Sequence, residues 1–506
     1  MNKIKKNNPL RNDIRLTVLT GPLAYAIPII GYCALYPIII RLSGYKVLGL
    51  WSLFASIPYA LSTLDMGFSQ HLARKANKDA DAKIISKLYI QYKIIKKIYL
   101  YSTVIVSILS LLILNFHSFA GLPYPKIFLN FTVILMITAV LIELYAKLDS
   151  AILRARHDNY FVQIINGLTP GLLFIVAITG SLMGFPIISL ALGYLFKHLC
   201  SLYIFKHRIA FKHPKWIDNG KLAKKYFLKN ELIDLYKNTI HLYGVSIGLM
   251  AREPILKITI TSVLGLGSLA SYEIAMRVGK TARSLLATGF SSLYPSFSIL
   301  LAKGLKRDIE FITQQSIILL VLLGWSGLTI VAQVSPWLYN IWLGKSTHEL
   351  ETATLLICIW NALTLFNIPF WYLLLAGNKE KFASFAIWIH TLSTLLIYPL
   401  SFSKTLSLAN ILTFWTFASF ATQIGIYFLV ERYFKIFFCT LRDQQVRMAI
   451  ITTILFIVIV TYCNDKTRLY QPYTEFISLG IFYGIAFILF RFNFTYWIKH
   501  DKAVKY

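Results

Sequence analysis

Long apolar segments alternate with short polar gaps along most of the chain. Each segment has close to the ~20 residues that a helix needs to cross the hydrocarbon core of a bilayer. The pattern predicts about 14 membrane-spanning helices, and therefore an all-α polytopic membrane protein. The predicted spans are residues 16–40, 47–64, 98–116, 127–146, 160–182, 186–205, 238–264, 268–301, 311–333, 351–376, 382–402, 406–430, 446–463 and 473–490.

One polar stretch, residues 206–237, divides the first twelve spans into two sets of six. We therefore predict an N-terminal lobe over 1–205, a cytoplasmic linker over 206–237, a second lobe over 238–430, and two further helices with a cytoplasmic tail over 431–506. The second and eighth spans open alike, with Leu48-Gly49-Leu50-Trp51 and with Gly267-Ser268-Leu269-Ala270, each after a very short outer turn. Matched positions in two halves fit a duplicated transporter.

Charge then sets the orientation. The chain carries 51 Lys and Arg against 22 Asp and Glu, a formal net charge of +29. Such a surplus can indicate a nucleic-acid partner, but here the basic residues gather in alternate gaps, which is the orientation signal of a membrane protein. Both termini are then cytoplasmic. Residues 1–15 are basic and lead into an apolar run without a small-residue cleavage site, so we expect a retained first span.

The sequence offers little for catalysis or for a cofactor. Its five cysteines are scattered and form no CxxC pair, and the histidines have no metal-ligand spacing. The Gly265-Leu266-Gly267 segment is expected to be a tight outer turn, because no strand precedes it and no GK[ST] follows. The longest outer gaps are short, at 334–350 and 464–472. We therefore expect no metal, no cofactor and no enzyme.

A set of charges inside apolar segments changes the picture. A charge at bilayer depth costs roughly 3 kcal/mol or more, so such residues usually face a bundle interior or a wet cavity. At 100° per residue, Glu273, Arg277 and Lys280 fall within about 60° of one another on the eighth span, and Arg283 lies near the same face. The full set is Arg252, Glu253, Lys257, Glu273, Arg277, Lys280 and Arg283.

The balance of this set predicts an anionic ligand. It holds five basic and two acidic residues. A diphosphate carries about two negative charges and accepts Arg in a bidentate manner. Arg252 is the best single candidate, since it lies deepest and has no carboxylate at i,i+4. In the alternative interpretation, Glu253–Lys257 and Glu273–Arg277 are ion pairs that hold the fold, and the other basic side chains reach toward an interface.

Two further carboxylates lie at the inner ends of spans. Asp65 ends the second span, and Glu143, near the end of the fourth, has Lys147 at i+4. Each carboxylate is a candidate for proton or sodium coupling or for an inner gate, and each could instead be a helix-end salt bridge. We favour the salt bridge for Glu143. For Asp65, Glu253 and Glu273, a role in coupling or gating and a structural ion pair both stay open.

Several short segments resemble Wzx-type polysaccharide flippases of the multidrug/oligosaccharidyl-lipid/polysaccharide (MOP) exporter superfamily. They cover the first twelve spans. The segments are LGLWSL at 48–53, LDMGFSQ at 64–70 with Arg74, SYEIAMR at 271–277, LYP at 293–295, PWL at 336–338 with WLG at 342–344, and PFWY at 369–372 with GN at 377–378.

The resemblance implies two six-helix lobes around a central cavity, a MATE-like architecture with two added helices. It implies a flippase of the bacterial inner membrane that moves an undecaprenyl-diphosphate-linked oligosaccharide outward for O-antigen (lipopolysaccharide) or capsule synthesis. A polysaccharide polymerase and a chain-length regulator are the implied partners. Two alternatives stay open: a cation-coupled multidrug exporter, whose cavity should be acidic, and a lipid II flippase.

Overall fold

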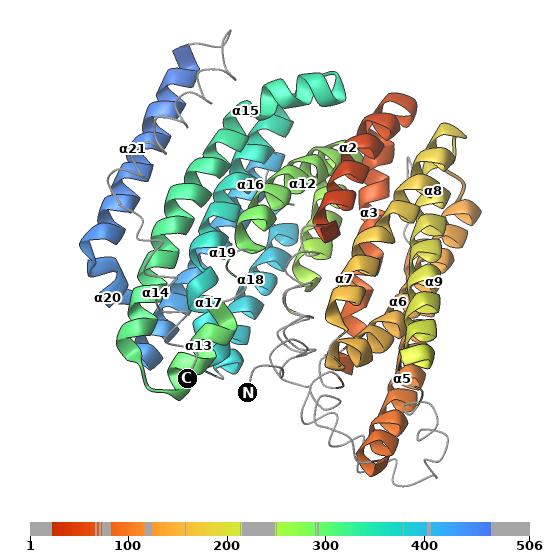
Figure 1. Cartoon of the computed structure of the whole chain (residues 1–506). Helices are drawn as coiled ribbons and strands as arrows, with labels where there is room; N and C mark the ends of the chain where they lie inside the picture. The colour runs from red at the N-terminus through yellow and green to blue at the C-terminus, as the bar shows by residue number, and fades with distance from the viewer. Residues whose placement is uncertain are drawn as a thin grey trace, which may run out of the picture. The chain divides into compact units, whose positions relative to one another are not determined.

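The computed structural model describes the chain between residues 23 and 466 with several gaps (Figure 1). The described residues are 23–65, 68, 69, 72, 82–116, 124–156, 158–212, 214, 248, 250–288, 290, 293–377, 379–401 and 406–466. Every regular element among them is a helix. The predicted span 473–490 lies outside the described residues.

Contacts divide the chain into two units, which are described separately. The first unit comprises the chain up to Ala270 together with Thr391–Thr405, and the second comprises Ser271–His390 and the chain from Leu406 onward. The division falls inside two helices, α12 (Leu266–Thr288) and α18 (Glu380–Ser401). The predicted lobe limits at 205 and 238 stay a prediction.

In the first unit, α9 packs along both α6 and α8, and α3 packs against α6 (Figure 1). A further helix covers 250–264. The elements of this unit are α2 (Leu23–Ser43), α3 (Tyr45–Leu61), the short 3₁₀ helix η1 (Ser62–Asp65), α5 (Ala82–Phe116), α6 (Lys126–Ala155), α7 (Asn159–Leu168), α8 (Pro170–Leu182) and α9 (Pro186–Lys212).

In the second unit, α16 lies between α15 and α19, and α21 packs on α14 and α15. The C-terminal part of α18 belongs to the first unit. The elements of the second unit are α12 from Ser271 on, α13 (Leu293–Ala302), α14 (Lys306–Leu319), the π-helical turn η2 (Leu320–Trp325), α15 (Ser326–Leu343), α16 (His348–Phe366), α17 (Ile368–Ala376), α18 (Glu380–Ser401) up to His390, α19 (Leu408–Phe434), α20 (Phe437–Arg442) and α21 (Gln444–Lys466).

Seven helices of the described chain are long and apolar enough to cross a membrane. They correspond to seven of the predicted spans and confirm a multi-pass membrane protein. They are Ala26–Ser43, Lys126–Ala155, Asn159–Leu182, Pro186–Lys212, Lys306–Leu343, His348–Phe366 and Leu408–Phe434.

Two of the predicted spans are divided at a proline, and a third is divided before one. Pro170 begins α8 and Pro369 lies in the first turn of α17, so the spans 160–182 and 351–376 each consist of two helical segments. The prediction of one continuous span over 268–301 was wrong, because α12 ends at Thr288 and α13 begins at Leu293. Pro295 lies in the first turn of α13, where its missing amide hydrogen leaves no helical bond unmade.

The two predicted outer turns have the same construction. Gly44 and Gly265 both adopt left-handed backbone, with φ of 84° and 88°. Each glycine amide donates to the carbonyl four residues earlier, and each glycine carbonyl accepts from the amide four residues later. The likeness that the sequence predicts between the starts of the second and eighth spans is therefore present in the backbone of these two turns.

The two turns also meet. Gly49, in the first turns of α3, lies against the backbone of Leu266, and a methyl group added at Gly49 would overlap the Leu266 carbonyl oxygen. A backbone atom cannot turn aside as a flexible side chain can. Gly49 is therefore the residue that lets α3 approach the 265–270 turn within the first unit.

We expect Gly49→Ala to lower the free energy of unfolding by about 1–3 kcal/mol, the usual cost of forcing an extra methyl group into a close contact. The measurement is thermal unfolding of the detergent-solubilised protein. Gly267→Ala is the matched control, since a methyl group there meets nothing within 4 Å. Equal melting temperatures for the two variants would contradict the close approach.

Candidate functional site

The first three predicted site residues lie together on the helix 250–264 of the first unit. The Glu253–Lys257 ion pair is present, with Lys257 Nζ 3.6 Å from Glu253 Oε1. Tyr59 of α3 lies within electrostatic range of both Arg252 and Glu253. This helix therefore brings Arg252 to the C-terminal end of α3.

The other predicted residues lie on α12 in the second unit. Arg277 Nη2 donates to Glu273 Oε1 at 2.9 Å. Glu273 is buried, whereas the Arg277 side chain is 33% exposed. Lys280 and Arg283 are half-buried on the same helix. Both ion pairs of the alternative interpretation are thus formed, and the convergence of the basic residues of the two helices on one cavity stays a prediction.

A close contact fixes the rotation of α12. A methyl group at Gly279 would lie 2.8 Å from Ile357 Cγ2 and 2.9 Å from Asn361 Nδ2, so Gly279 faces α16 directly. On the same helix Met276 is buried, whereas Arg277 and Lys280 are half-buried. The long aliphatic parts of these two side chains can cover apolar surface while their charges reach a polar medium.

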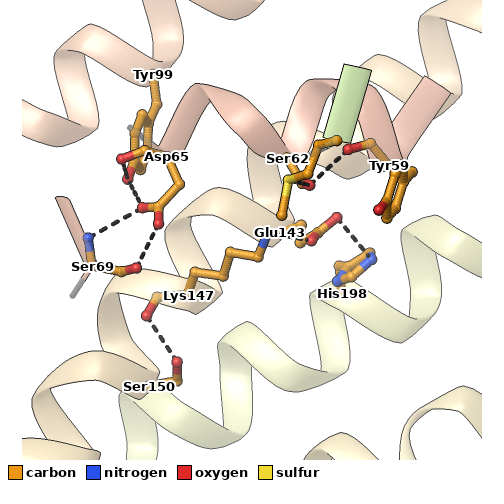
Figure 2. A network of polar contacts seen from close by, with 10 residues as sticks. Tyr59, Ser62, Asp65, Ser69, Tyr99, Glu143, Lys147, Ser150 and His198 are labelled. Carbon is orange, nitrogen blue, oxygen red and sulfur yellow. Dashed lines mark hydrogen bonds and ion pairs between the residues drawn. The ribbon is translucent and has the colours of Figure 1, made fainter. Parts of the chain in front are cut away.

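Asp65 has partners on its own turn and on α5. Figure 2 shows its carboxylate between Tyr99 and Ser69. The Tyr99 hydroxyl donates to Oδ1, while the Ser69 hydroxyl donates to Oδ2 at 2.5 Å and the Ser69 amide to Oδ1 at 3.2 Å. The carboxylate therefore joins the end of η1 to α5 inside the first unit. Its role in coupling or gating stays a prediction.

Glu143 joins two helices. Its Oε1 lies 2.8 Å from Lys147 Nζ, which confirms the pair predicted from the i+4 spacing, and its Oε2 lies 3.6 Å from His198 Nε2 on α9 (Figure 2). Lys197, next to His198, interacts electrostatically with both Glu143 and Lys147. Sequence reasoning missed Lys197 and His198 as a site, although a basic dipeptide inside the span 186–205 meets the criterion that selected Arg252.

Two buried aspartates hold the cytoplasmic-side ends of the helices, on the predicted orientation. Asp149 Oδ1 accepts from the Tyr92 hydroxyl at 2.6 Å and lies 3.9 Å from Lys96 Nζ. Asp158, just before α7, accepts from Arg208 Nε at 2.9 Å and from Lys212 Nζ at 2.8 Å, both on α9. Both carboxylates come from elements far apart in sequence from their partners, and no spacing rule signals either pair.

Metal ligation gains no support from the described residues, which contain no group of three or more His, Cys, Asp or Glu placed to hold an ion. Four of the cysteines, Cys33, Cys200, Cys358 and Cys439, are free thiols. The chemistry of the described helices therefore rests on ion pairs and hydroxyl–carboxylate hydrogen bonds.

No protein-family model matches the sequence, and no curated protein matches it. Solved structures do. Lipid II flippase MurJ in an inward closed conformation has a TM-score of 0.67 and 12% identity, covering 94% of this chain and 98% of that one. An inward-facing multidrug resistance MATE family transporter of the MOP superfamily has a TM-score of 0.67 and 14% identity, covering 84% of this chain and 96% of that one.

A MOP superfamily transporter from Pyrococcus furiosus, whose binding pocket has reversed polarity, has a TM-score of 0.60 and 13% identity, covering 85% of this chain and 97% of that one. Identities this low establish the fold alone. The chain is thus a multi-pass membrane protein of all-α, MATE-like fold, and its structural neighbours are transporters of the MOP superfamily.

Removing the buried hydroxyl with Tyr99→Phe should lower the free energy of unfolding by about 1–3 kcal/mol, because Asp65 then loses a buried hydrogen-bond donor. The measurement is thermal unfolding in detergent. Tyr101→Phe, at an exposed tyrosine of the same helix, is the control and should leave the melting temperature unchanged. An unchanged melting temperature for Tyr99→Phe would show that the hydrogen bond does not hold η1 to α5.

Asp158 should make stability depend on pH. Burial alone would raise the pKa of this carboxyl, but the hydrogen bonds and charges of Arg208 and Lys212 outweigh burial and hold it below its ordinary value. The stabilisation is then fully present at neutral pH and is lost as the pH falls below about 4, through the folded-state pKa. The difference in melting temperature between wild type and Asp158→Asn should therefore be largest near pH 7 and shrink in acid.

Glu349→Gln, at an exposed glutamate, is the control for this titration and should follow the wild-type curve. A wild-type to Asp158→Asn difference that stays constant from pH 7 to pH 3 would contradict the ion pair.

Proposed function

We propose that this protein is a flippase that moves an undecaprenyl-diphosphate-linked oligosaccharide across the bacterial inner membrane, for the synthesis of a surface polysaccharide such as O-antigen or capsule. One observation carries the proposal: basic residues outnumber acidic ones on helices of a MOP-transporter fold, at positions that the hydropathy pattern assigns to membrane depth. A positively charged interior suits an anionic cargo.

The charge balance supports a diphosphate. Each intrahelical pair, Glu253–Lys257 and Glu273–Arg277, neutralises one basic residue, and the set as a whole keeps three more basic than acidic residues. Arg252 is assigned the direct phosphate contact, because a guanidinium donates two parallel hydrogen bonds to phosphate oxygens. The lipid tail would stay in the bilayer while the head group passes through the protein.

The structural neighbours support a lipid-linked cargo. The lipid II flippase matches 94% of this chain, whereas the MATE family transporter and the Pyrococcus furiosus MOP superfamily transporter quoted above match 84% and 85%. A cation-coupled exporter of cationic drugs should have an acidic interior, and the balance here is basic. The Pyrococcus furiosus neighbour, with its pocket of reversed polarity, is a precedent for one fold with interiors of different sign.

Lipid II transport is the second candidate, favoured by the same 94% coverage. Lipid II and a polysaccharide repeat unit share the polyprenyl diphosphate and differ in the sugars, so the basic residues serve either cargo equally. The two candidates separate in the cell: loss of a lipid II flippase stops wall synthesis, whereas loss of a polysaccharide flippase removes the surface polymer.

Transport would follow alternating access, with the two lobes rocking around the bound head group and both termini in the cytoplasm. The chain itself would carry out no covalent chemistry. A polysaccharide polymerase and a chain-length regulator would act on the repeat units that it delivers.

We expect Arg252→Ala to cause inner-leaflet accumulation of lipid-linked repeat units and at least about tenfold less surface polysaccharide, since a charge-assisted contact worth about 1.5–3 kcal/mol is lost. The measurement is extraction of the lipid-linked sugars and quantification of surface polymer, at matched protein level. Lys306→Ala, at a basic residue that is 54% exposed, is the control. Normal surface polymer in the Arg252→Ala strain would count against the assignment.

A further inference from the structure

A cluster of four titratable side chains joins α6 to α9 within the first unit. Glu143 and Lys147 come from α6, and Lys197 and His198 come from α9. The Glu143 carboxylate lies at the centre, 2.8 Å from Lys147 Nζ and 3.6 Å from His198 Nε2, and Lys197 interacts electrostatically with it. The predicted site on the helix 250–264 and α12 does not include any of these residues.

On the predicted topology the cluster lies at the cytoplasmic side of the membrane, because the fourth predicted span ends at residue 146, between Glu143 and Lys147. Glu143 precedes the end of α6 at Ala155 by 12 residues, or about 18 Å of helix, and Lys147 precedes it by 8 residues, or about 12 Å. Lys197 lies 8 residues before Phe205, the predicted end of its span. All of these ends lie on the side that the loop charges assign to the cytoplasm, so the cluster is at the depth of the inner leaflet.

Two of the helices beside α9 are apolar. The segments α7 and α8, which pack against α9, contain no charged residue. A third helix that packs against α9, α3, carries only Lys46, at the opposite end of that helix from η1. On the α6 side, α5 and η1 contribute Lys96 and Asp65, and these have partners of their own in Asp149, Tyr99 and Ser69. With His198 neutral, the cluster therefore holds two positive charges and one negative charge in a medium where an uncompensated charge is costly.

The side chains of the cluster differ in exposure. The Lys147 side chain is 34% exposed, the Glu143 carboxylate 17% and the His198 ring 8%. An anion would therefore meet Lys147 first and would replace the Glu143 carboxylate between Lys147 and His198. The His198 imidazole, the least exposed of the three, would lie on the buried side of the bound anion.

We propose that Lys147, Lys197 and His198 bind a phosphate group of the lipid-linked diphosphate at the inner leaflet, and that Glu143 is a built-in counter-ion that the phosphate must displace. The inference rests on the proposed function, since it names a first docking point for the same cargo. Its new element is the role of Glu143, which sets the minimum charge that a ligand must carry.

The reason is electrostatic. A phospholipid such as phosphatidylglycerol carries one negative charge on its phosphate, so exchanging it for the single charge of Glu143 gains little. A diphosphate carries about two negative charges and more acceptor oxygens, so the exchange is favourable. Glu143 would thus keep the abundant phospholipids out of the site without excluding the diphosphate.

The test uses the purified full-length protein in detergent and three probes: farnesyl diphosphate, phosphatidylglycerol and inorganic pyrophosphate. Wild type should bind farnesyl diphosphate at least about tenfold more tightly than phosphatidylglycerol. Glu143→Gln keeps the shape but removes the charge, so it should tighten phosphatidylglycerol binding about tenfold and narrow this ratio. Glu310→Gln removes the carboxylate of another i,i+4 pair, Lys306–Glu310, and should leave every affinity unchanged.

The sign of the Glu143→Gln effect decides the question. A carboxylate that merely holds α6 to α9 would, when neutralised, leave both affinities unchanged or weaken both, and either result overturns the proposal. If Glu143→Gln fails to fold, the test uses Lys197→Gln, which leaves the Glu143–Lys147 pair intact. This variant should bind farnesyl diphosphate about tenfold more weakly, and unchanged binding would also overturn the proposal. Inorganic pyrophosphate binding as tightly as farnesyl diphosphate would assign the site to a soluble phosphate and overturn the lipid part.

The inference and the proposed function can fail separately. The probes contain no sugar, so they test the phosphate site and not the transport of repeat units. The expected Glu143→Gln effect on probe binding, together with normal surface polysaccharide in the Arg252→Ala strain, would contradict the proposed function alone. Accumulation of repeat units in the Arg252→Ala strain, together with probe affinities that Glu143→Gln leaves unchanged, would contradict this inference alone.

Discussion

The cost of placing a charge at membrane depth governs the arrangement of the described helices. In the first unit, three acidic side chains each have a counter-charge or donor within a few ångströms: Glu253 with Lys257, Glu143 with Lys147 and His198, and Asp65 with Tyr99. Some of these contacts stay within one helix, whereas others join two. The interhelical ones fix how the helices pack, because moving either helix would leave a charge without its partner.

Contacts within a helix can be predicted from the sequence, and contacts between helices cannot. The i,i+4 spacing alone predicts the pairs Glu253–Lys257, Glu273–Arg277 and Glu143–Lys147, and all three are formed. Nothing in the sequence pairs Asp65 with Tyr99, or Glu143 with His198, since these contacts depend on how separate helices dock. The position of Lys197 in an apolar span is a signal that could have found it, but its partner lies on another helix and has no spacing that reveals it.

Span lengths predict most of the helices, yet their breaks follow rules that length alone does not contain. Pro170 and Pro369 divide two spans as the missing amide hydrogen requires. The two glycine turns at Gly44 and Gly265 are expected from their motifs and have the same hydrogen bonds. With solved neighbours at 12–14% identity, the fold is retained while nearly every side chain differs. The function of such a chain therefore depends on which charges its interior holds.

The π-helical turn η2 has a consequence for how the 38-residue helix from Lys306 to Leu343 meets its neighbours. A π-turn contains one residue more than an α-helical turn, so every side chain after it is rotated by about 100° relative to an uninterrupted helix. With this offset the buried positions of α14, such as Thr313 and Ile317, and those of α15, such as Leu328 and Tyr339, fall on one side of the long helix. A single-residue deletion within η2 would convert this turn into an α-helical one and leave α15 facing the same way, whereas a deletion between Trp325 and Tyr339 would turn Tyr339 away from Thr354, its hydrogen-bond partner on α16.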